Sequence, residues 1–242
     1  MKVLLIHNRY KEAGGEDVVF QAEADLLVRN RNLVETIIFD NSAIKTFWDK
    51  LLSGLRVIYN PVSARLLENR IREFDSDVIH VHNFVPLASP SIFFVARRHR
   101  IPVVLTLHNF RLICPSATLF HKNRLYEKSG RSLFPVEAVV RGVYRNSVWQ
   151  TAAVALMTAV HSILGTWRNS IALYITLTSF ARKKFTDSAI AIPDHKMIVK
   201  QNFIQDCGRG EIDRKDYYLF VGRLTEEKGI RTLLEATRLL DF

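Results

Sequence analysis

The 242-residue sequence predicts an α/β protein with a parallel β-sheet covered by helices on both faces. Strand-like and helical segments alternate along residues 1–204, which is the pattern of such a sheet. Hydrophobic residues make up 48% of the chain, enough for one substantial core or for one domain and part of another. We find no internal repeat and no low-complexity segment.

Short apolar, β-branched runs predict six strands in this region. They are Lys2–His7, Val34–Phe39, Asp77–His82, Pro102–His108, Ala172–Thr178 and Met197–Asn202. The intervening helices are expected at Gly15–Arg29, Asn41–Leu52, Val62–Glu73, Ser89–His99 and Ser179–Phe185. Helical spacing in the first helix places on its inner side Val18, Val19, Ala22, Leu26 and Leu27.

A second unit is expected to begin near the end of the sequence. The polar residues 205–216 break the alternating pattern and indicate a linker between domains. A strand is predicted at Tyr217–Val221, then a turn at Gly222 and a helix capped by Thr225. One strand and one helix cannot bury both faces of a sheet, so we expect poor coverage of Tyr217, Leu219, Leu233 and Leu234. Residues 217–242 are thus interpreted as the incomplete start of a second domain.

The net charge of +10 and isoelectric point of about 9.8 indicate an anionic partner. The basic residues are scattered and form no nucleic-acid module, so a membrane surface or an anionic substrate ranks above nucleic acid. Cys114 and Cys207 are too few and too distant for a disulfide framework, and Met1 leads directly into a strand without a secretory signal. A cytoplasmic location is therefore expected.

Residues Val148–Trp167 contain no charged side chain and are flanked by Arg145 and Arg168. A membrane-spanning helix is one interpretation, but six polar residues make the segment much less apolar than a typical span. A packed or surface-lying helix is favoured, with peripheral attachment to an anionic leaflet through the surrounding basic residues.

Four histidines fall at the carboxyl ends of predicted strands, the edge where parallel sheets bind ligands. His7 ends the first strand, His80 and His82 end the third, and His108 ends the fourth. The two-residue period of a strand places His80 and His82 on one face. Each imidazole by itself is more readily explained as a cap of its strand or by a hydrogen bond to a nearby carbonyl, so the clustering is what favours a binding site.

A zinc site is an alternative explanation of the same histidines. His80 and His82 with a third histidine from a neighbouring strand and a water molecule can complete a tetrahedron. No carboxylate is evident beside them in the sequence, so we expect no metal. A zinc hydrolase remains the less favoured hypothesis.

Gly14 and Gly15 follow the first strand and let the backbone approach a ligand closely. The free N–H groups of the next helix could bind a phosphate or a sugar hydroxyl, although Glu16 and Asp17 would compete with an anion. A plain turn is the default interpretation of two adjacent glycines.

Two cations lie close to the predicted turn at Gly222. Arg223 lies in the turn and Lys228 in the first helical turn, where side chains and backbone N–H groups can hold a phosphate. Taken alone, both are more readily explained as solvated surface charges, and only the surrounding motifs favour a phosphate site.

Together these motifs resemble family 4 (group 1) glycosyltransferases, which have the GT-B fold of two Rossmann-like domains. The resemblance lies in the order and spacing of Gly14-Gly15-Glu16, Asp77–His82, Thr106–Asn109, Leu177–Arg182, Val199–Asn202, Phe220–Arg223 and Glu227–Gly229. It implies retaining transfer of a sugar from a nucleotide-sugar donor to a saccharide or lipid-linked acceptor in envelope polysaccharide synthesis, without a cofactor or metal.

The resemblance also assigns roles to residues. Arg223 and Lys228 would neutralise the donor diphosphate, and His108 would lie beside the reacting sugar as the catalytic residue. The cleft on the acceptor side would be lined by Gly14, Gly15, His80, His82 and Asn109. No residue is assigned as a covalent nucleophile.

One departure from the family pattern concerns the end of the sequence. Relatives carry a pair of glutamates in a later donor-site segment, which is not found before Phe242. The isolated chain is therefore expected to have little transferase activity, and a non-catalytic acceptor- or membrane-binding remnant is the alternative. The sequence does not identify the sugar, nucleotide, acceptor or oligomeric state.

Overall fold

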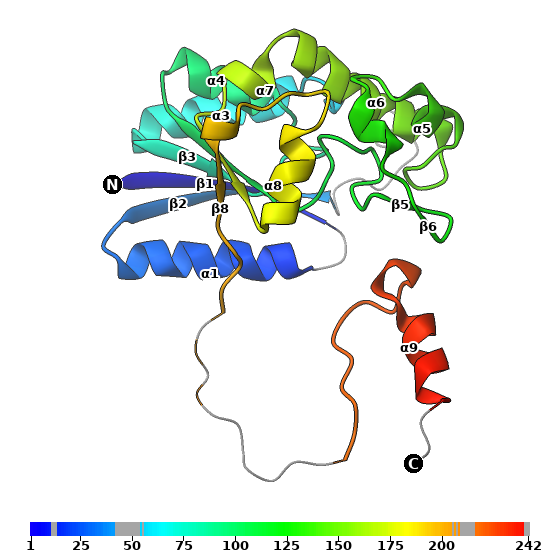
Figure 1. Cartoon of the computed structure of the whole chain (residues 1–242). Coiled ribbons are helices and arrows are strands. Elements are labelled where there is room, and N and C mark those ends of the chain that lie inside the picture. The colour runs from blue at the N-terminus through cyan, green and yellow to red at the C-terminus, as the bar shows by residue number, and fades with distance from the viewer. Residues whose placement is uncertain are drawn as a thin grey trace.

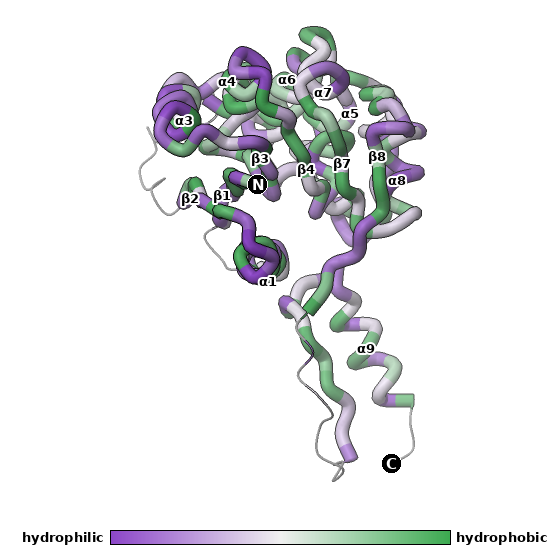
Figure 2. The backbone as a smooth tube through the Cα atoms, turned by 90° about the vertical axis from the view of Figure 1, so that its left-hand side faces the viewer, coloured by the Kyte–Doolittle hydropathy of each residue, from purple (hydrophilic) through white to green (hydrophobic). Residues whose placement is uncertain are grey.

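The computed structural model describes residues 1–10, 14–41, 54, 56–204, 206, 208 and 216–239. Its centre is a six-stranded parallel sheet (Figure 1), with the strands in the order β2-β1-β3-β4-β7-β8 (Figure 2). The strands are β1 Lys2–Arg9, β2 Leu33–Asp40, β3 Val78–Val81, β4 Val103–Leu107, β7 Leu173–Thr176 and β8 Met197–Val199. All six predicted strands of residues 1–204 are confirmed, as is the Rossmann-like α/β fold class.

The α-helices described are α1 Gly15–Arg29, α3 Pro61–Phe74, α4 Ser91–Arg98, α5 Val136–Val140, α6 Val148–Ile163, α7 Thr166–Asn169, α8 Ser179–Thr186 and α9 Ile230–Thr237. Short 3-10 helices occur at η2 Lys128–Arg131, η3 Asp194–Lys196 and η4 Glu226–Lys228, and a small hairpin joins β5 Phe120–His121 to β6 Arg124–Leu125. Four predicted helices correspond to α1, α3, α4 and α8. The fifth, Asn41–Leu52, lies outside the described residues apart from Asn41.

Strand β1 separates two apolar layers because successive side chains point to opposite faces. Leu4 and Ile6 join the large core, which also contains residues of α3, α4, α6 and α8. Val3 and Leu5 pack on the other face against Phe20 of α1. Figure 2 shows α1 on one side of the sheet and α3, α4, α6 and α7 on the other. The fold therefore has three layers, with helices on both faces as predicted.

Helix α1 is rotated relative to the prediction. Val18 and Leu26 are 65% and 43% exposed, whereas Phe20, Glu23 and Ala24 are buried against the sheet. The predicted inner side was therefore only partly correct. The prediction used the spacing of apolar residues only and therefore left out Glu23. This charged residue faces the sheet because polar side chains of the sheet lie opposite it.

The strand order has a switch point beside β1, and we call this part of the sheet edge the crevice. The connection after β1 leads to β2 on one side of it, and the connection after β2 leads to β3 on the other side. The two connections therefore run away from β1 in opposite directions. Connections diverge at such a point, and ligands of parallel sheets bind there at the carboxyl ends. The crevice lies where β1 ends at Arg9 and β3 ends at Val81.

The uncharged segment Val148–Trp167 forms α6 and the start of α7. Ser147 caps α6 by accepting a hydrogen bond from the Gln150 N–H, and Trp167 is fully buried against Phe84 and Phe93. The prediction of a packed helix is confirmed. Among the helices of the described residues, none combines the length and apolar character needed to cross a membrane.

The C-terminal segment differs from the prediction. Tyr217–Val221 forms no strand, so that prediction was wrong; no neighbouring strand among the described residues offers the hydrogen-bond partners that hold an extended segment in a sheet. Thr225 makes no side-chain cap, and helix α9 begins only at Ile230, after the 3-10 turn η4.

The predicted poor coverage of this segment is confirmed. Its exposed apolar side chains include Tyr217 at 68%, Leu219 at 74%, Leu234 at 57% and Leu233 at 36%.

Phe93 offers a test of the larger core. It is fully buried between Phe84 and Trp167, so Phe93→Ala should lower the free energy of unfolding by about 3–5 kcal/mol through lost burial and a residual cavity. The control Leu125→Ala removes a side chain that is 80% exposed and should change stability by less than about 0.5 kcal/mol. Urea denaturation monitored by circular dichroism measures both; equal effects would contradict this packing.

Candidate functional site

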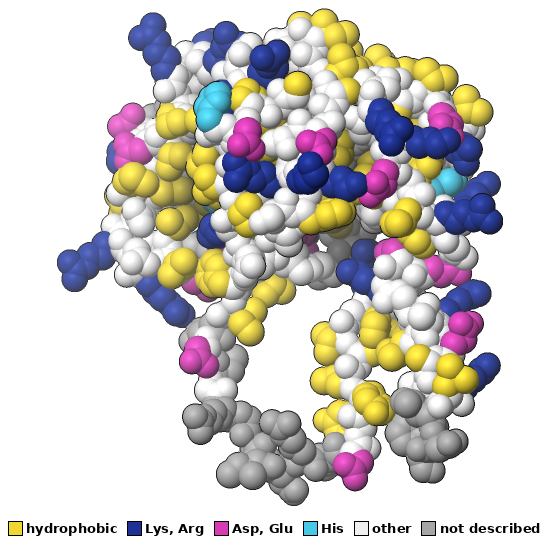
Figure 3. Space-filling model, in the orientation of Figure 1, with side chains coloured by type: hydrophobic (Ala, Val, Ile, Leu, Met, Phe, Trp, Pro, Cys, Tyr) yellow, Lys and Arg dark blue, Asp and Glu magenta, His cyan; other side chains and the backbone are white. Residues whose placement is uncertain are grey.

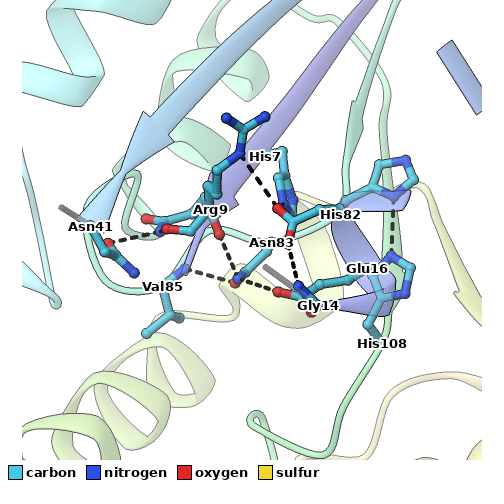
Figure 4. Close-up of polar contacts among 11 residues, drawn as sticks. His7, Arg9, Gly14, Glu16, Asn41, His82, Asn83, Val85 and His108 are labelled. Carbon is cyan, nitrogen blue, oxygen red and sulfur yellow. Dashed lines mark hydrogen bonds and ion pairs between the residues drawn. The ribbon is translucent and has the colours of Figure 1, made fainter. Parts of the chain in front are cut away.

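The four histidines predicted at the sheet edge come together in the structure. The His82 Nδ1 lies 3.0 Å from the His108 Nε2, and these two rings are stacked (Figure 4). The His80 and His82 ring centroids are 4.4 Å apart, and those of His7 and His82 are 6.5 Å apart. The prediction that His80 and His82 share a face is confirmed, and this face is the one covered by α1.

Two side chains that sequence reasoning did not place here complete the cluster. Glu23 of α1 lies with its Oε2 at 3.5 Å from the His80 Nδ1 and 3.4 Å from the His82 Nε2. Its Oε1 pairs with the Lys200 ammonium just after β8. The available signal was a glutamate between the apolar residues of an amphipathic helix, at a position that faces the core.

The cluster combines one buried anion with neutral imidazoles. Burial alone would raise the pKa of Glu23, but the neighbouring His82 and the Lys200 ammonium outweigh it and lower this pKa to about 2. Burial, reinforced by the neighbouring His82, lowers the pKa values of His80 and His108 to about 3 each. At neutral pH, Glu23 is therefore ionised while His80 and His108 are uncharged.

The glycine loop is tied to β1 through Asp17. The Asp17 Oδ1 lies 2.9 Å from the His7 Nε2, and its Oδ2 accepts a hydrogen bond of 2.8 Å from the Gly14 N–H. His7 also stacks on Phe20 of α1. The Gly14 N–H is therefore already bonded to the Asp17 carboxylate. This is the competition with a bound anion that we expected from Asp17.

Gly14 and Gly15 border open space. A Cβ atom built on either glycine would have no neighbour within 4 Å among the described residues, and Gly14 has an extended backbone with φ of −131°. Neither packing within the chain nor a left-handed backbone explains why these positions are glycine. Their remaining physical property is the close approach that they allow to a bound molecule.

Asn83 links three parts of the crevice (Figure 4). Its Nδ2 donates to the Asn8 carbonyl at 2.8 Å and to the Glu16 Oε1 at 3.1 Å, while its Oδ1 accepts from the Val85 N–H at 3.2 Å. This side chain therefore fixes the end of β1, the start of α1 and the loop after β3 relative to one another.

Glu16 is a second carboxyl group at this edge. Burial and the nearby Asp17 charge raise its pKa to about 7, although Asn83 and the cations Arg111 and Arg223 oppose the shift.

The remaining predicted site residues are Arg223, Lys228 and Asn109. Arg223 lies 3.7 Å from Glu227 and its side chain is 60% exposed, while Lys228 is exposed in η4. Among the described residues, neither cation contacts the histidines. The Asn109 Oδ1 accepts a 3.0 Å hydrogen bond from the Arg111 N–H, which shapes the loop after β4.

The structure describes one of the two cysteines, for which the sequence predicts no disulfide framework. Cys114 is buried and free, and Cys207 lies outside the described residues.

The six-stranded parallel sheet with helices on both faces defines a Rossmann-like domain, and the polar cluster lies at the strand ends beside β1. The family model described as Glycosyltransferase Family 4 matches residues 27–159. The chain belongs to this family, which confirms the resemblance found in the sequence motifs.

One curated relative is the "Uncharacterized 42.6 kDa protein in cps region" of Klebsiella pneumoniae, 26% identical over 184 residues. The match covers 74% of this chain and 42% of the relative, so the chain spans less than half the length of that protein.

Similar solved structures include the UDP-GlcNAc 2-epimerase of Methanocaldococcus jannaschii, with 12% identity and a TM-score of 0.44. HepE of Anabaena, solved in complex with UDP, has 14% identity and a TM-score of 0.43. These matches cover 82% and 84% of this chain and 45% and 44% of the two solved chains.

Glu16 predicts a pH dependence of stability. Its pKa is about 7 in the folded state against an ordinary value of 4.5, so the folded state holds this proton more tightly than the unfolded state. The associated stability is present below pH 4.5 and is lost as the pH rises through 7. In Glu16→Gln this loss, on the order of 2–3 kcal/mol, should disappear.

Urea unfolding at pH 5, 6, 7 and 8 measures the effect as the difference between wild type and variant. Glu73→Gln on α3 is a matched control, because that side chain is 67% exposed and lies outside the crevice. A wild-type and Glu16→Gln difference that stays constant across this pH range would show that Glu16 does not titrate as described.

Proposed function

We propose that the chain forms part of a retaining glycosyltransferase that moves a sugar from a nucleotide-sugar donor to a saccharide or lipid-linked acceptor. Residues 1–204 would be the acceptor-side domain, 205–216 the linker, and 217–242 the beginning of the donor domain. One observation carries the proposal: the His82 Nδ1 contacts the His108 Nε2 at the strand ends of a Family 4 domain, the same sheet edge at which Gly14 and Gly15 border open space.

His108 is the proposed catalytic residue. Its ring is neutral because burial and His82 lower its pKa to about 3, and the His82 contact holds it at the end of β4. Cleavage of a glycosidic bond develops positive charge on the sugar ring. A neutral imidazole can hydrogen-bond a sugar hydroxyl there without adding a repelling charge, which supports a positioning and polar role rather than a covalent one.

Arg223 and Lys228 are the proposed donor-phosphate ligands. Negative charge grows on the diphosphate as it leaves, and preorganised cations stabilise that charge without a metal ion. Both side chains are exposed, so a phosphate can reach them.

The acceptor side of the proposed cleft consists of Gly14, Gly15, His80, His82 and Asn109. His80 and His82 are buried and would form the floor, whereas the glycines border open space where a sugar could approach. Asn109 would shape the cleft wall through its hydrogen bond to the Arg111 backbone.

We propose envelope polysaccharide synthesis as the setting, supported by the K. pneumoniae relative from a cps region. Peripheral contact with the inner face of the membrane is supported by exposed apolar side chains on α5 and α6, among them Val140 at 72%, Trp149 at 54% and Ile163 at 77%. Figure 3 shows hydrophobic side chains over this region beside Lys and Arg residues. Apolar groups framed by cations match an anionic bilayer surface.

The donor site is tested by binding. The double variant Arg223→Ala, Lys228→Ala should bind nucleoside-diphosphate sugars at least about tenfold more weakly, because charge-assisted hydrogen bonds to phosphate are lost. Isothermal titration calorimetry with UDP-, GDP- and ADP-linked sugars measures this. Arg231→Ala is the control, since this exposed cation pairs with Glu226 on the same segment.

Tighter binding by wild type than by the double variant, with the control unchanged, supports the phosphate role. Equal affinities would remove Arg223 and Lys228 from the donor site. If no nucleotide sugar binds to the wild-type chain, residues 217–242 do not by themselves form a donor site.

Membrane contact is tested with vesicles. The chain should sediment with vesicles rich in phosphatidylglycerol, be released by salt, and bind phosphatidylcholine vesicles weakly. Trp149→Ser with Ile163→Ser should reduce sedimentation several-fold, because the buried apolar area falls. Val18→Ser, which changes an exposed residue on α1 across the sheet, should have no effect; similar losses in both variants would contradict the proposed surface.

A further inference from the structure

Three ligand atoms converge in the buried cluster between α1 and β3. Glu23, His80 and His82 each offer one ligand atom, and these three atoms lie within 4.8 Å of one another. The Glu23 Oε2 faces the His80 Nδ1 and the His82 Nε2. We propose that this cluster is a binding site for a divalent transition-metal ion of the zinc class. The site lies away from the proposed phosphate ligands and does not depend on the proposed transfer reaction.

The distances suit such an ion. Ligands about 2.0–2.1 Å from a tetrahedral Zn²⁺ are themselves about 3.3–3.4 Å apart. The Glu23 Oε2 lies 3.4 Å from the His82 Nε2 and 3.5 Å from the His80 Nδ1. These separations are long for hydrogen bonds but nearly match two edges of the coordination tetrahedron. Two histidines and one glutamate form a known three-residue zinc set, with the fourth position open to water.

One nitrogen at the centre has no other partner. His82 is 2% exposed, and its Nε2 forms no hydrogen bond with any of the described residues, although it lies 3.4 Å from the Glu23 Oε2. A buried polar atom without a partner is costly and uncommon in native structures. A metal ion would satisfy this nitrogen and the Glu23 Oε2 together.

The outward-facing atoms are already held by the protein. The His80 Nε2 lies 2.8 Å from the Thr106 Oγ1, the His82 Nδ1 contacts His108, and the Glu23 Oε1 pairs with Lys200. Metal-binding histidines usually engage their second nitrogen in this way, which fixes the ring orientation and leaves the other nitrogen for the ion. All three candidate ligands are therefore oriented before a metal arrives.

This set differs from the zinc site considered from the sequence. There, a third histidine was required from a neighbouring strand, and no carboxylate was evident. In the structure His108 is occupied by the His82 contact, and Glu23 of α1 supplies the third ligand instead.

Metal binding would also affect His108. An ion on the His82 Nε2 leaves the ring proton on Nδ1, which then donates to the His108 Nε2. His108 would in turn carry its own proton on Nδ1. The ion thus fixes one tautomer of the proposed catalytic histidine and ties α1 to β3.

The experiment uses the full chain, stripped with a chelator and titrated with ZnCl₂. We expect one equivalent of Zn²⁺ to bind, with a raised Tm and a tetrahedral visible spectrum after Co²⁺ substitution. His82→Gln and Glu23→Gln should each lower zinc affinity by at least about 100-fold. His99→Gln is the matched control, because His99 contacts Glu68 at 2.9 Å outside the cluster and should leave binding unchanged.

Lys200→Met separates a metal site from a simple ion-pair network. Removing the ammonium takes a repelling charge from the ion and should tighten zinc binding, whether or not the metal-free variant is less stable. The proposal is overturned if the wild-type chain binds no stoichiometric Zn²⁺, or if His82→Gln binds as tightly as wild type. Unchanged or weaker binding in Lys200→Met would also contradict the stated geometry.

Discussion

The ligand edge of this protein depends on the buried carboxylate of Glu23. One oxygen faces two histidines of the β3 end, and the other pairs with Lys200 beyond β8, so one side chain of α1 contacts both the centre and the far side of the sheet. An ionised group removed from water is tolerated only when its partners compensate for lost hydration. The requirement for these partners couples the position of α1 to that of the strand ends.

The rotation of α1 follows from this contact. Phe20 and Ala24 pack on the apolar part of the sheet while Glu23, between them on the helix, meets the polar part. At the N-terminus of the same helix, Asp17 holds His7 and the glycine loop. The helix therefore carries structural contacts along its inner face and leaves the glycines beside open space. A rigid support beneath an accessible loop is the arrangement that precise ligand binding requires.

The polar groups around the crevice act as a connected network. Asn83 joins β1, α1 and the β3 loop, and His82 joins Glu23 to His108. Because each group has its partner in a different element, small displacements of one element would change the environment of the others. His108, the residue proposed to meet the sugar, is thereby linked through His82 to a buried carboxylate that a substrate in the crevice need not touch.

The sequence by itself determined the fold class, the six strands of residues 1–204 and the gathering of His7, His80, His82 and His108. Strand periodicity and the parallel topology fix these features, because the carboxyl ends of parallel strands must share one edge. The family also followed from motif order. Local pattern failed at Tyr217–Val221, where the strand propensity finds no neighbouring strand to pair with among the described residues. Only the tertiary structure placed Glu23 and Lys200, which are 177 positions apart, in one ion pair. Contacts between a helix face and distant strands depend on helix rotation and packing, and no local sequence pattern encodes those.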